Sequence, residues 1–231
     1  MTKIALLGYG TIGSGVAEVL RINKESIAKK AGDQIEIKYI LDLRKFPGDP
    51  NEDKIVHDYD VILNDPEIAV VVEAMGGVEP AYTFTKNALL AGKSVATSNK
   101  ALVAKHGAEL IALAGEKNLN FLFEASVGGG IPIIRPLKQC LAGNEISEVM
   151  GIVNGTTNYI LTKMEKDGAD FASALREAQD LGYAEANPSA DVDGFDAQRK
   201  IMILTAIATG KMLSEDSVYT ETMTRLTPDD I

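Results

Sequence analysis

The residues best suited to chemistry lie in one polar segment, residues 185–200, which leads directly into an apolar run at 201–207. Asp196 and Lys200 are four residues apart, so a helix that begins near Asp193 would carry both side chains on one face. The chain has only two histidines and one cysteine, so an acid or base in it has to be mostly carboxylate or lysine. The alternative interpretation of this pair is a surface ion pair, which contributes about 0.3–0.5 kcal/mol.

A second lysine of interest, Lys100, follows a short predicted strand at 94–97 and precedes a predicted helix at 101–114. In a doubly wound sheet the carboxyl ends of the strands line the ligand crevice. Lys100 is therefore a candidate proton donor or acceptor, and a solvated lysine at a helix start is the alternative. Another strand, 68–72, leads to Gly76 at the same edge, where we expect the glycine to allow close approach of a cofactor.

A glycine-rich turn links the first predicted strand, residues 3–7, to a lengthened first helix. Gly8 suits the tight turn, Gly10 lets the backbone approach a pyrophosphate, and Gly13 allows close packing of helix on strand. The anion would sit at the helix N-terminus. The strand, turn and helix together predict a dinucleotide site.

The second predicted strand, 35–41, ends in Asp42, a position from which an acid binds the ribose hydroxyls of the adenosine. Arg44 and Lys45 follow and can neutralise a 2′-phosphate. Asp42 therefore favours NAD, whereas Arg44 and Lys45 favour NADP, and the choice stays open. Residues 47–60 are polar and contain Pro and Gly, which is typical of a surface loop.

Two polar turns come later in the chain. The glycines at 128–130 expose backbone groups that can line a ligand cleft or coordinate a hard cation, and a hinge between domains is a compatible alternative. After a strand-like stretch at 145–149, Gly155 and Thr156 belong to a turn whose N–H groups can bind a carboxylate.

The alternation of strands and helices weakens after residue 130. We therefore predict an α/β fold with an N-terminal Rossmann-type, doubly wound parallel sheet over residues 1–130. Residues 131–231 would form a second, α+β domain that includes a helix at 171–181.

Composition narrows the classes of partner. The chain has 231 residues and a net charge of -10 without clustered Lys or Arg, which argues against a nucleic-acid partner. Its apolar runs are far shorter than the ~20 residues that span a bilayer, and its N-terminus lacks a signal-peptide pattern. We therefore expect a cytoplasmic protein with no membrane partner.

Five ordered motifs cover nearly the whole chain and resemble homoserine dehydrogenase. They are GYGTIGSGV at 8–16, TSNK at 97–100, EASVGGGIP at 124–132, NGTTNYI at 154–160, and GYAE with DVDGFDAQRK at 182–200. The resemblance implies interconversion of L-homoserine and L-aspartate 4-semialdehyde with NAD or NADP, in threonine and methionine biosynthesis. It also implies that residues 131–231 bind the substrate and form a homodimer.

The resemblance gives roles to the polar residues. Lys100 and Lys200 would flank the reacting hydroxyl, and Asp196 would set the position and charge of Lys200. One of the two lysines would be the base, because burial can lower the pKa of a lysine toward neutrality. The substrate ammonium would be held by Glu185 and Asp191. The other substrate-binding residues would be Gly155 and Thr156, which hold the carboxylate, and Tyr183.

The same resemblance extends the cofactor site and adds a cation. On the cofactor side it adds Thr11, Ile12, Thr97 and Ser98. A monovalent cation such as sodium has a matching set of residues, with backbone carbonyls as most ligands: Glu124, Val127, Gly129 and Ile131.

Two departures and two alternatives accompany the resemblance. Leu41 stands where many members carry Arg, which weakens the case for NADP, and members continue beyond the position of Ile231, so we expect the second domain to be truncated. Another amino-acid dehydrogenase, such as aspartate dehydrogenase, would share the glycine loop but has no reason to carry the 185–200 segment. A non-catalytic dinucleotide-binding fragment is the other alternative.

Overall fold

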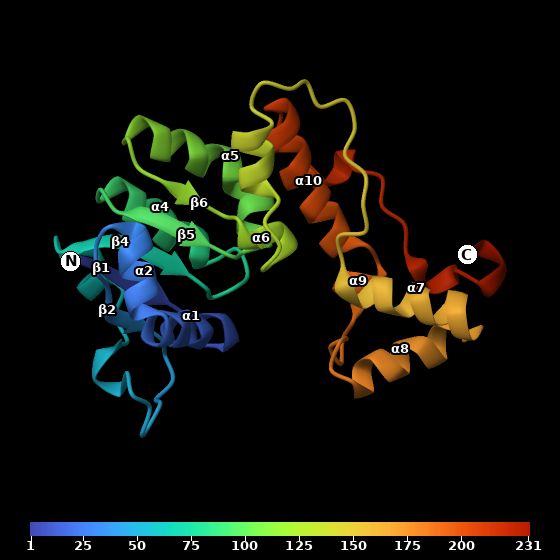
Figure 1. The fold of residues 1–231 in the computed structure, drawn as a ribbon, viewed down its shortest axis with the longest axis horizontal. Helices are drawn as coiled ribbons and strands as arrows, with labels where there is room; N and C mark the ends of the chain where they lie inside the picture. The colour runs from blue at the N-terminus through green and yellow to red at the C-terminus, as the bar shows by residue number, and fades with distance from the viewer. The chain divides into compact units, whose positions relative to one another are not determined.

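The computed structural model describes residues 1–231, except for the side chain of Pro228. The chain divides into two compact units, Met1–Pro132 and Ile133–Ile231. The first unit consists of a sheet with helices around it, and the second consists of helices joined by irregular segments (Figure 1).

Six parallel strands form the sheet of the first unit, in the order β3-β2-β1-β4-β5-β6. They are β1 (Thr2–Leu7), β2 (Ile35–Leu41), β3 (Ile55–Val56), β4 (Ile68–Glu73), β5 (Ser94–Thr97) and β6 (Phe121–Leu122). Successive residues of β1 such as Leu6 and Leu7 are both fully buried, as a sheet covered on both faces requires. The predicted doubly wound sheet is confirmed. Its strand order reverses between β1 and β4, so the ligand crevice opens at the carboxyl ends of these strands.

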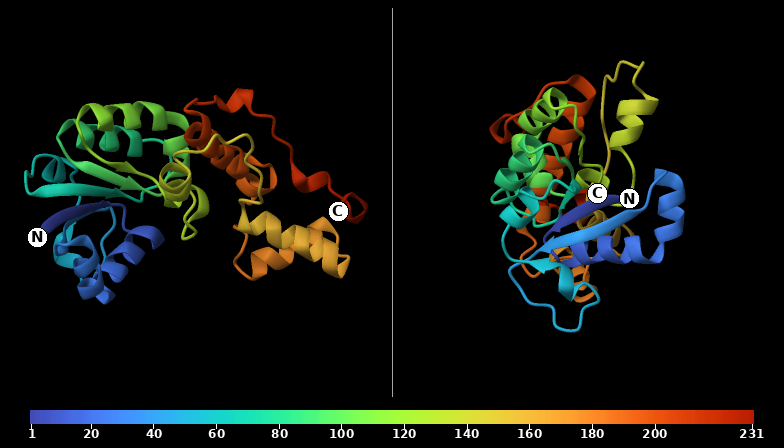
Figure 2. Two further views of the ribbon diagram at one scale, coloured as in Figure 1. Left: turned by 45° about the horizontal axis from the view of Figure 1, so that its top comes forward. Right: turned by 90° about the vertical axis from the view of Figure 1, so that its left-hand side faces the viewer.

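Helices cover both faces of this sheet. On one face lie α1 (Thr11–Ile22) and α2 (Lys24–Ala31), and on the other lie α4 (Ala81–Leu90) and α5 (Lys100–Glu116), as Figure 2 shows. The predicted single first helix is in fact two, because the chain breaks at Asn23 (φ -102°, ψ 20°). Two short helices, α3 (Asp60–Leu63) and α6 (Ala125–Gly128), complete the unit.

The segment 47–60 is more ordered than the predicted surface loop. It contains the 3-10 turn η1 (Glu52–Lys54) and strand β3, which pairs with β2 through Ile40 and Leu41. The β-branched pair Ile55 and Val56 supplies this edge strand, so the segment returns to the sheet and brings its last residues to the crevice.

The second unit is helical throughout its described elements. Its helices are α7 (Gly155–Asp167), α8 (Phe171–Asp180), α9 (Ser189–Val192) and α10 (Phe195–Thr209), with a π-helical turn η2 (Pro136–Cys140) and the 3-10 turns η3 (Glu215–Ser217), η4 (Met223–Arg225) and η5 (Pro228–Asp230). Helices α7 and α8 pack around a core that includes Ile160, Met164, Ala174 and Ala178. Nowhere in the described chain is a helix both long enough and apolar enough to span a bilayer.

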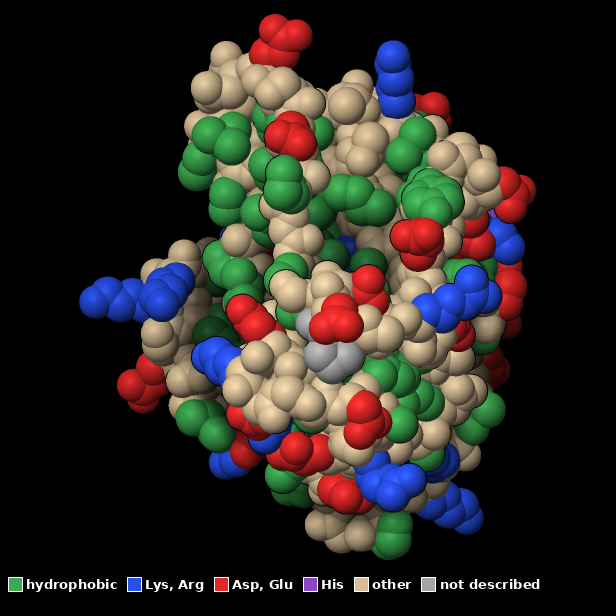
Figure 3. Space-filling model, turned by 90° about the vertical axis from the view of Figure 1, so that its right-hand side faces the viewer, with side chains coloured by type: hydrophobic (Ala, Val, Ile, Leu, Met, Phe, Trp, Pro, Cys, Tyr) green, Lys and Arg blue, Asp and Glu red, His purple; other side chains and the backbone are tan. Residues whose placement is uncertain are grey.

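The strand predicted at 145–149 is wrong, because these residues have no regular secondary structure. A strand needs a neighbouring strand to bond its backbone, and the described residues of the second unit contain no strand that could pair with this segment. Just beyond it, Met150 and Ile152 are 84% and 68% exposed. Figure 3 shows one face of the molecule, on which hydrophobic side chains are exposed among charged side chains of both signs.

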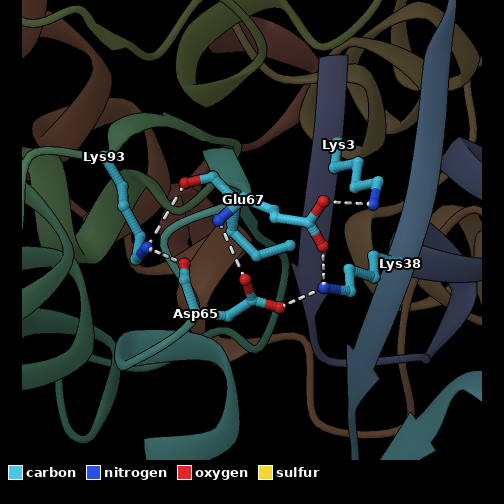
Figure 4. Close-up of polar contacts among 6 residues, drawn as sticks. Lys3, Lys38, Asp65, Glu67 and Lys93 are labelled. Carbon is cyan, nitrogen blue, oxygen red and sulfur yellow. Dashed lines mark hydrogen bonds and ion pairs between the residues drawn. The ribbon is translucent and has the colours of Figure 1, made fainter. Parts of the chain in front are cut away.

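Charged residues form a cluster at the amino ends of the strands (Figure 4). This amino-end cluster consists of Lys3, Lys38, Asp65, Glu67 and Lys93. Lys38 is paired with Asp65 and Glu67, and Lys3 Nζ lies 2.7 Å from Glu67 Oε1. Lys93 is 3% exposed, and its Nζ donates to the backbone carbonyl of Asp65 at 2.6 Å. Burial lowers the pKa of Lys93, whereas the two carboxylates raise the pKa of Lys38.

Candidate functional site

The glycine turn between β1 and α1 is fixed by close backbone contacts. A Cβ at Gly13 would lie 2.0 Å from the carbonyl oxygen of Gly8, and one at Gly8 would lie 2.9 Å from the carbonyl oxygen of Ala74. A Cβ at Gly10 would meet only the Arg44 guanidinium, at 3.9 Å. Packing therefore requires the first and third glycines, while the space above Gly10 is open, which fits a pyrophosphate.

Helix α1 begins directly after this space. Its N-cap, Gly10, contributes no side-chain hydrogen bond, so the first-turn N–H groups, among them those of Thr11 and Ile12, are not capped by a side chain. Both residues are exposed. An anion is a natural partner for such a helix start.

A cavity of about 450 Å³ adjoins the glycine turn. Its walls include residues 41–44, residues 74–75, His57 and Tyr59. Tyr59 stacks on Phe84 with ring centroids 4.1 Å apart, and both rings line the cavity. An apolar wall beside glycines suits a flat, partly apolar ligand.

Asp42 lies at the mouth of this cavity with every acceptor position in use. Its Oδ2 accepts the Tyr9 N–H at 2.8 Å and Arg44 Nη2 at 2.9 Å. Its Oδ1 accepts the backbone N–H and Nε of Arg44, at 2.9 and 3.0 Å. The Arg44 side chain is the main reason that the pKa of Asp42 is well below its usual range. Lys45, the other predicted 2′-phosphate residue, is exposed.

The remaining predicted cofactor residues lie on the loop after β4 and in the segment from the end of β5 to the start of α5. Gly76 has a φ of +80°, which favours glycine. Thr97 is 6% exposed, and its hydroxyl donates to the buried carboxylate of Glu73 at 2.5 Å. Ser98 is partly buried, and Lys100 is the first residue of α5.

In the second unit, α10 carries Asp196 and Lys200 on one face. Lys200 Nζ lies 2.7 Å from Asp196 Oδ2, and it also donates to the carbonyl of Val153 at 2.7 Å. The Lys200 and Asp196 side chains are only 11% and 3% exposed. This burial argues against the alternative of a surface ion pair.

Asn154 joins this pair to a second carboxylate. Its Nδ2 donates to Asp196 Oδ2 at 2.8 Å and to Asp191 Oδ1 at 2.7 Å. Its Oδ1 accepts the Thr157 N–H at 2.8 Å, which caps α7. The Asn154 amide thus links two carboxylates, and Lys200 pairs with one of them, Asp196.

A glycine determines how this segment enters α10. Gly194, its N-cap, has a φ of +83°, and a Cβ there would lie 2.9 Å from the carbonyl oxygen of Glu221. The turn that brings Asp191 and Asp196 together therefore has no space for a side chain at residue 194.

The other predicted substrate residues surround the start of α7. Gly155 and Thr156 are in its first turn, and the Thr156 hydroxyl donates to the Tyr183 carbonyl at 2.7 Å. Tyr183 is 58% exposed, and Glu185 is also exposed. The structure thus collects Thr156, Asn154, Asp191, Asp196 and Lys200 within the second unit, while Lys100 belongs to the first.

The residues predicted to hold a cation surround α6. Glu124 precedes this helix, Val127 lies within it, and Gly129 ends it with a φ of +58°. Ile131 follows, and its N–H donates to the Gly128 carbonyl at 2.9 Å. In the part of the chain that the structure describes, no cluster of three or more His, Cys, Asp or Glu could hold a metal.

Sequence reasoning missed His57, Tyr59 and Phe84 in the cavity and gave no role to Asn154. Ile55 and Val56 were the available signal for the first two, because a β-branched pair indicates a strand that leads to the crevice. For Asn154 the signal was an asparagine just before a helical pattern, the usual position of an N-cap.

Comparisons with known proteins agree across both units. The family described as "Homoserine dehydrogenase, NAD binding domain" matches residues 8–124, and the family described as "Homoserine dehydrogenase" matches residues 132–231. Among curated relatives, the homoserine dehydrogenase of Synechocystis sp. is 47% identical over 95% of this chain and 51% of its own. That of Bacillus subtilis is 43% identical over 99% of this chain and 54% of its own.

Solved structures give the same result. A homoserine dehydrogenase from Thiobacillus denitrificans has a TM-score of 0.91 and 43% identity, and the match covers 99% of this chain and 54% of that one. A hyperthermophilic archaeal homoserine dehydrogenase in complex with NADPH has a TM-score of 0.80 and 31% identity over 91% of this chain and 70% of that one. The chain spans about half the length of the curated relatives it matches.

Proposed function

Because the chain belongs to the homoserine dehydrogenase family, we propose that it carries the catalytic residues for interconverting L-homoserine and L-aspartate 4-semialdehyde with NAD or NADP. The observation that best supports this proposal is the buried pair of Asp196 and Lys200, 2.7 Å apart and bonded to Asn154. Asp196 and the Val153 carbonyl hold the buried Lys200 amine in one position, and a positioned amine suits proton transfer better than a mobile, solvated one.

The first unit would hold the dinucleotide. The open space above Gly10 and the start of α1, including Thr11 and Ile12, suit the pyrophosphate, and the cavity beside Tyr59 suits the adenosine. A bound nicotinamide accepts the hydride from the carbon that carries the hydroxyl.

The lysines would move the proton. As homoserine is oxidised, the hydroxyl loses a proton to the Nζ of Lys200 or of Lys100, and both remain candidates. Asp196 and the Val153 carbonyl would hold the Lys200 amine in place. In the reverse direction the same Nζ returns the proton to the aldehyde oxygen.

The second unit would orient the amino acid. Asp191 and Glu185 would bind its ammonium group. The Asn154 amide holds the Asp191 carboxylate in place, because it donates to Asp191 and to Asp196. The N-terminal turn of α7, with Gly155 and Thr156, would bind its carboxylate through backbone N–H groups. Tyr183, tied to Thr156 through its carbonyl, would border this site.

The choice between NAD and NADP would depend on Asp42 and Arg44. With all four acceptor positions of Asp42 in use, ribose hydroxyls can bind it only by displacing the Arg44 guanidinium. A 2′-phosphate would instead attract that guanidinium, so Asp42 favours NAD and Arg44 favours NADP.

Two further parts of the proposal concern a cation and assembly. Glu124 and the carbonyls of Val127, Gly129 and Ile131 would hold a monovalent cation, because the turn after α6 keeps these residues close in sequence and space. Replacing sodium by a bulky organic cation during the assay would test it. The second unit would form a homodimer, which sedimentation measures directly.

The test of the function is absorbance of NADH and NADPH with L-homoserine and, separately, L-aspartate. Oxidation of homoserine alone supports the proposal, and Lys200→Met is expected to lower kcat by about 10²–10⁴-fold, the range of general acid–base catalysis. Oxidation of aspartate would indicate an aspartate dehydrogenase. Cofactor binding without turnover would indicate a non-catalytic dinucleotide-binding chain. Near-normal turnover of both Lys200→Met and Lys100→Met would contradict the assignment of the base.

A further inference from the structure

We propose that Glu73 is a positioning residue that holds both loops of the cofactor crevice, and the start of α5 with Lys100, through one buried carboxylate. This rests on the proposed dinucleotide site. Glu73 is the last residue of β4 and is fully buried. A carboxylate in such a position is costly unless it is well bonded.

The hydrogen bonds of Glu73 come from the loop after β4, from the end of β5 and from the loop that follows β5. Its Oε1 accepts the Met75 N–H at 2.8 Å and Asn99 Nδ2 at 3.5 Å. Its Oε2 accepts the Thr97 hydroxyl at 2.5 Å. Met75 belongs to the loop after β4, while Thr97 and Asn99 belong to β5 and the loop after it. One side chain therefore connects the two.

On the β4 side, this bond fixes the wall behind the glycine turn. Ala74 and Met75 both line the cavity. A Cβ at Gly8 would lie 2.9 Å from the Ala74 carbonyl oxygen and 3.1 Å from Met75 Cα, so the turn packs directly on this loop. A shift of Met75 would therefore change the space available to a dinucleotide.

On the β5 side, the same carboxylate reaches α5 through Asn99. The Thr97 hydroxyl accepts the Asn99 N–H at 2.9 Å, and Asn99 Nδ2 donates to the Gly77 carbonyl at 2.6 Å. Asn99 Oδ1 caps α5 by accepting the Leu102 N–H at 3.1 Å. Lys100 follows Asn99 directly, so its backbone position depends on this network.

The test compares Glu73→Gln with Glu67→Gln, a matched change at the residue that directly precedes β4. A glutamine fills the same volume, but its NH₂ group deprives either the Met75 N–H or the Thr97 hydroxyl of an acceptor. We expect the dissociation constant for NADH, measured by its fluorescence, to rise about tenfold in Glu73→Gln, as a loss of roughly 1.4 kcal/mol implies. Glu67→Gln should stay within about twofold of the unmodified chain.

A purely structural role would lower the thermal midpoint Tm and leave NADH affinity unchanged well below Tm. Equal NADH affinity for the two Gln variants would therefore overturn the proposal. In turnover, the KM for the cofactor should rise and the KM for homoserine should change less than about twofold, because Met75 and Thr97, whose hydrogen bonds change, belong to the proposed cofactor site.

A second pair of variants keeps the proposal testable if Glu73→Gln does not fold. Thr97→Val removes the hydroxyl and should weaken NADH binding as Glu73→Gln does, whereas Thr97→Ser keeps the hydroxyl and should stay closer to the unmodified chain. Identical affinities for Val and Ser would contradict it. If the unmodified chain does not bind NADH at all, the proposed function fails as well, and the measurement separates this case from a failure of Glu73 alone.

Discussion

Glu67 directly precedes strand β4 and Glu73 ends it, and the two side chains have opposite surroundings. The Glu67 side chain is 55% exposed and bonds Lys3 and Lys38, which are charged. Glu73 is fully buried, and the three donors it accepts from are neutral: an N–H, a hydroxyl and an amide. At the amino end, the charges join strands to one another. At the carboxyl end, a buried carboxylate joins loops whose outer side faces the crevice.

This difference between the two carboxylates indicates that the amino end of the sheet contributes mainly to stability and the carboxyl end also to ligand binding. Exposed ion pairs such as Lys3 with Glu67 each contribute little and are screened by salt, so the amino-end cluster stabilises the sheet through the number of these pairs and through the buried hydrogen bonds of Lys93. The carboxyl end depends on a few buried hydrogen bonds to a single carboxylate, that of Glu73. Damage there should change ligand affinity as well as stability.

The largest effect is expected at the glycine turn, where Gly13→Ala would bring a methyl group to 2.0 Å from the Gly8 carbonyl oxygen. We expect a loss of about 3 kcal/mol of unfolding free energy, because neither backbone segment can move easily, together with loss of NADH binding. Thermal and urea denaturation measure it. Gly15→Ala is the matched control, because a Cβ at Gly15 meets nothing within 4 Å. A similar stability for both variants would be incompatible with the contact.

Lys93→Met should damage the amino end alone. It removes the donor to the Asp65 and Ile68 carbonyls, and leaving buried acceptors unpaired costs about 1–3 kcal/mol. Tm should fall, while the affinity for NADH below Tm should remain within about twofold, because the cluster lies away from the crevice. Lys105→Met, an exposed change on α5, serves as control. Weaker NADH binding in Lys93→Met would contradict the proposal that the amino end of the sheet affects stability and the carboxyl end affects binding.

Arg44→Ala should change cofactor preference at the carboxyl end with little loss of stability. It frees acceptor positions of Asp42 for ribose hydroxyls and removes a cation that a 2′-phosphate can use. We expect the ratio of NADP to NAD dissociation constants to increase about tenfold, the equivalent of one charge-assisted hydrogen bond. Parallel titrations with both cofactors measure it, with the exposed Lys45→Ala as a weaker comparison. An unchanged ratio would mean that Arg44 has no part in the choice.

The smallest effect concerns acid. The lysines of the amino-end cluster lower the pKa values of Asp65 and Glu67, so their folded pKa values lie below the unfolded ones. Their stabilisation is therefore present above about pH 4, near the unfolded values, and is lost as the pH falls through the folded values. Tm measured from pH 6 to pH 3 should fall less steeply in Lys38→Met. Equal slopes would show that these pairs are not coupled to folding.

Local patterns were enough to predict the sheet and the glycine turn, since each strand and the Gly8 to Gly13 spacing can be recognised within a few residues. Contacts between distant residues could not be predicted in this way. Asn154 bonds a carboxylate 37 residues away, and Glu73 bonds a hydroxyl 24 residues away. The strand prediction for residues 145–149 was wrong for a related reason, because a strand forms only where another strand pairs with its backbone.

Gly10 differs from Gly8 and Gly13 in the kind of selection that would keep a glycine at its position over many generations of mutation. Since a Cβ there meets only the tip of a flexible arginine, a library of variants selected for folding alone should accept many residues at position 10 and almost none at position 13. The same library selected for dinucleotide capture should lose this tolerance at position 10. The contrast between the two selections would identify the residue that serves the ligand and not the fold.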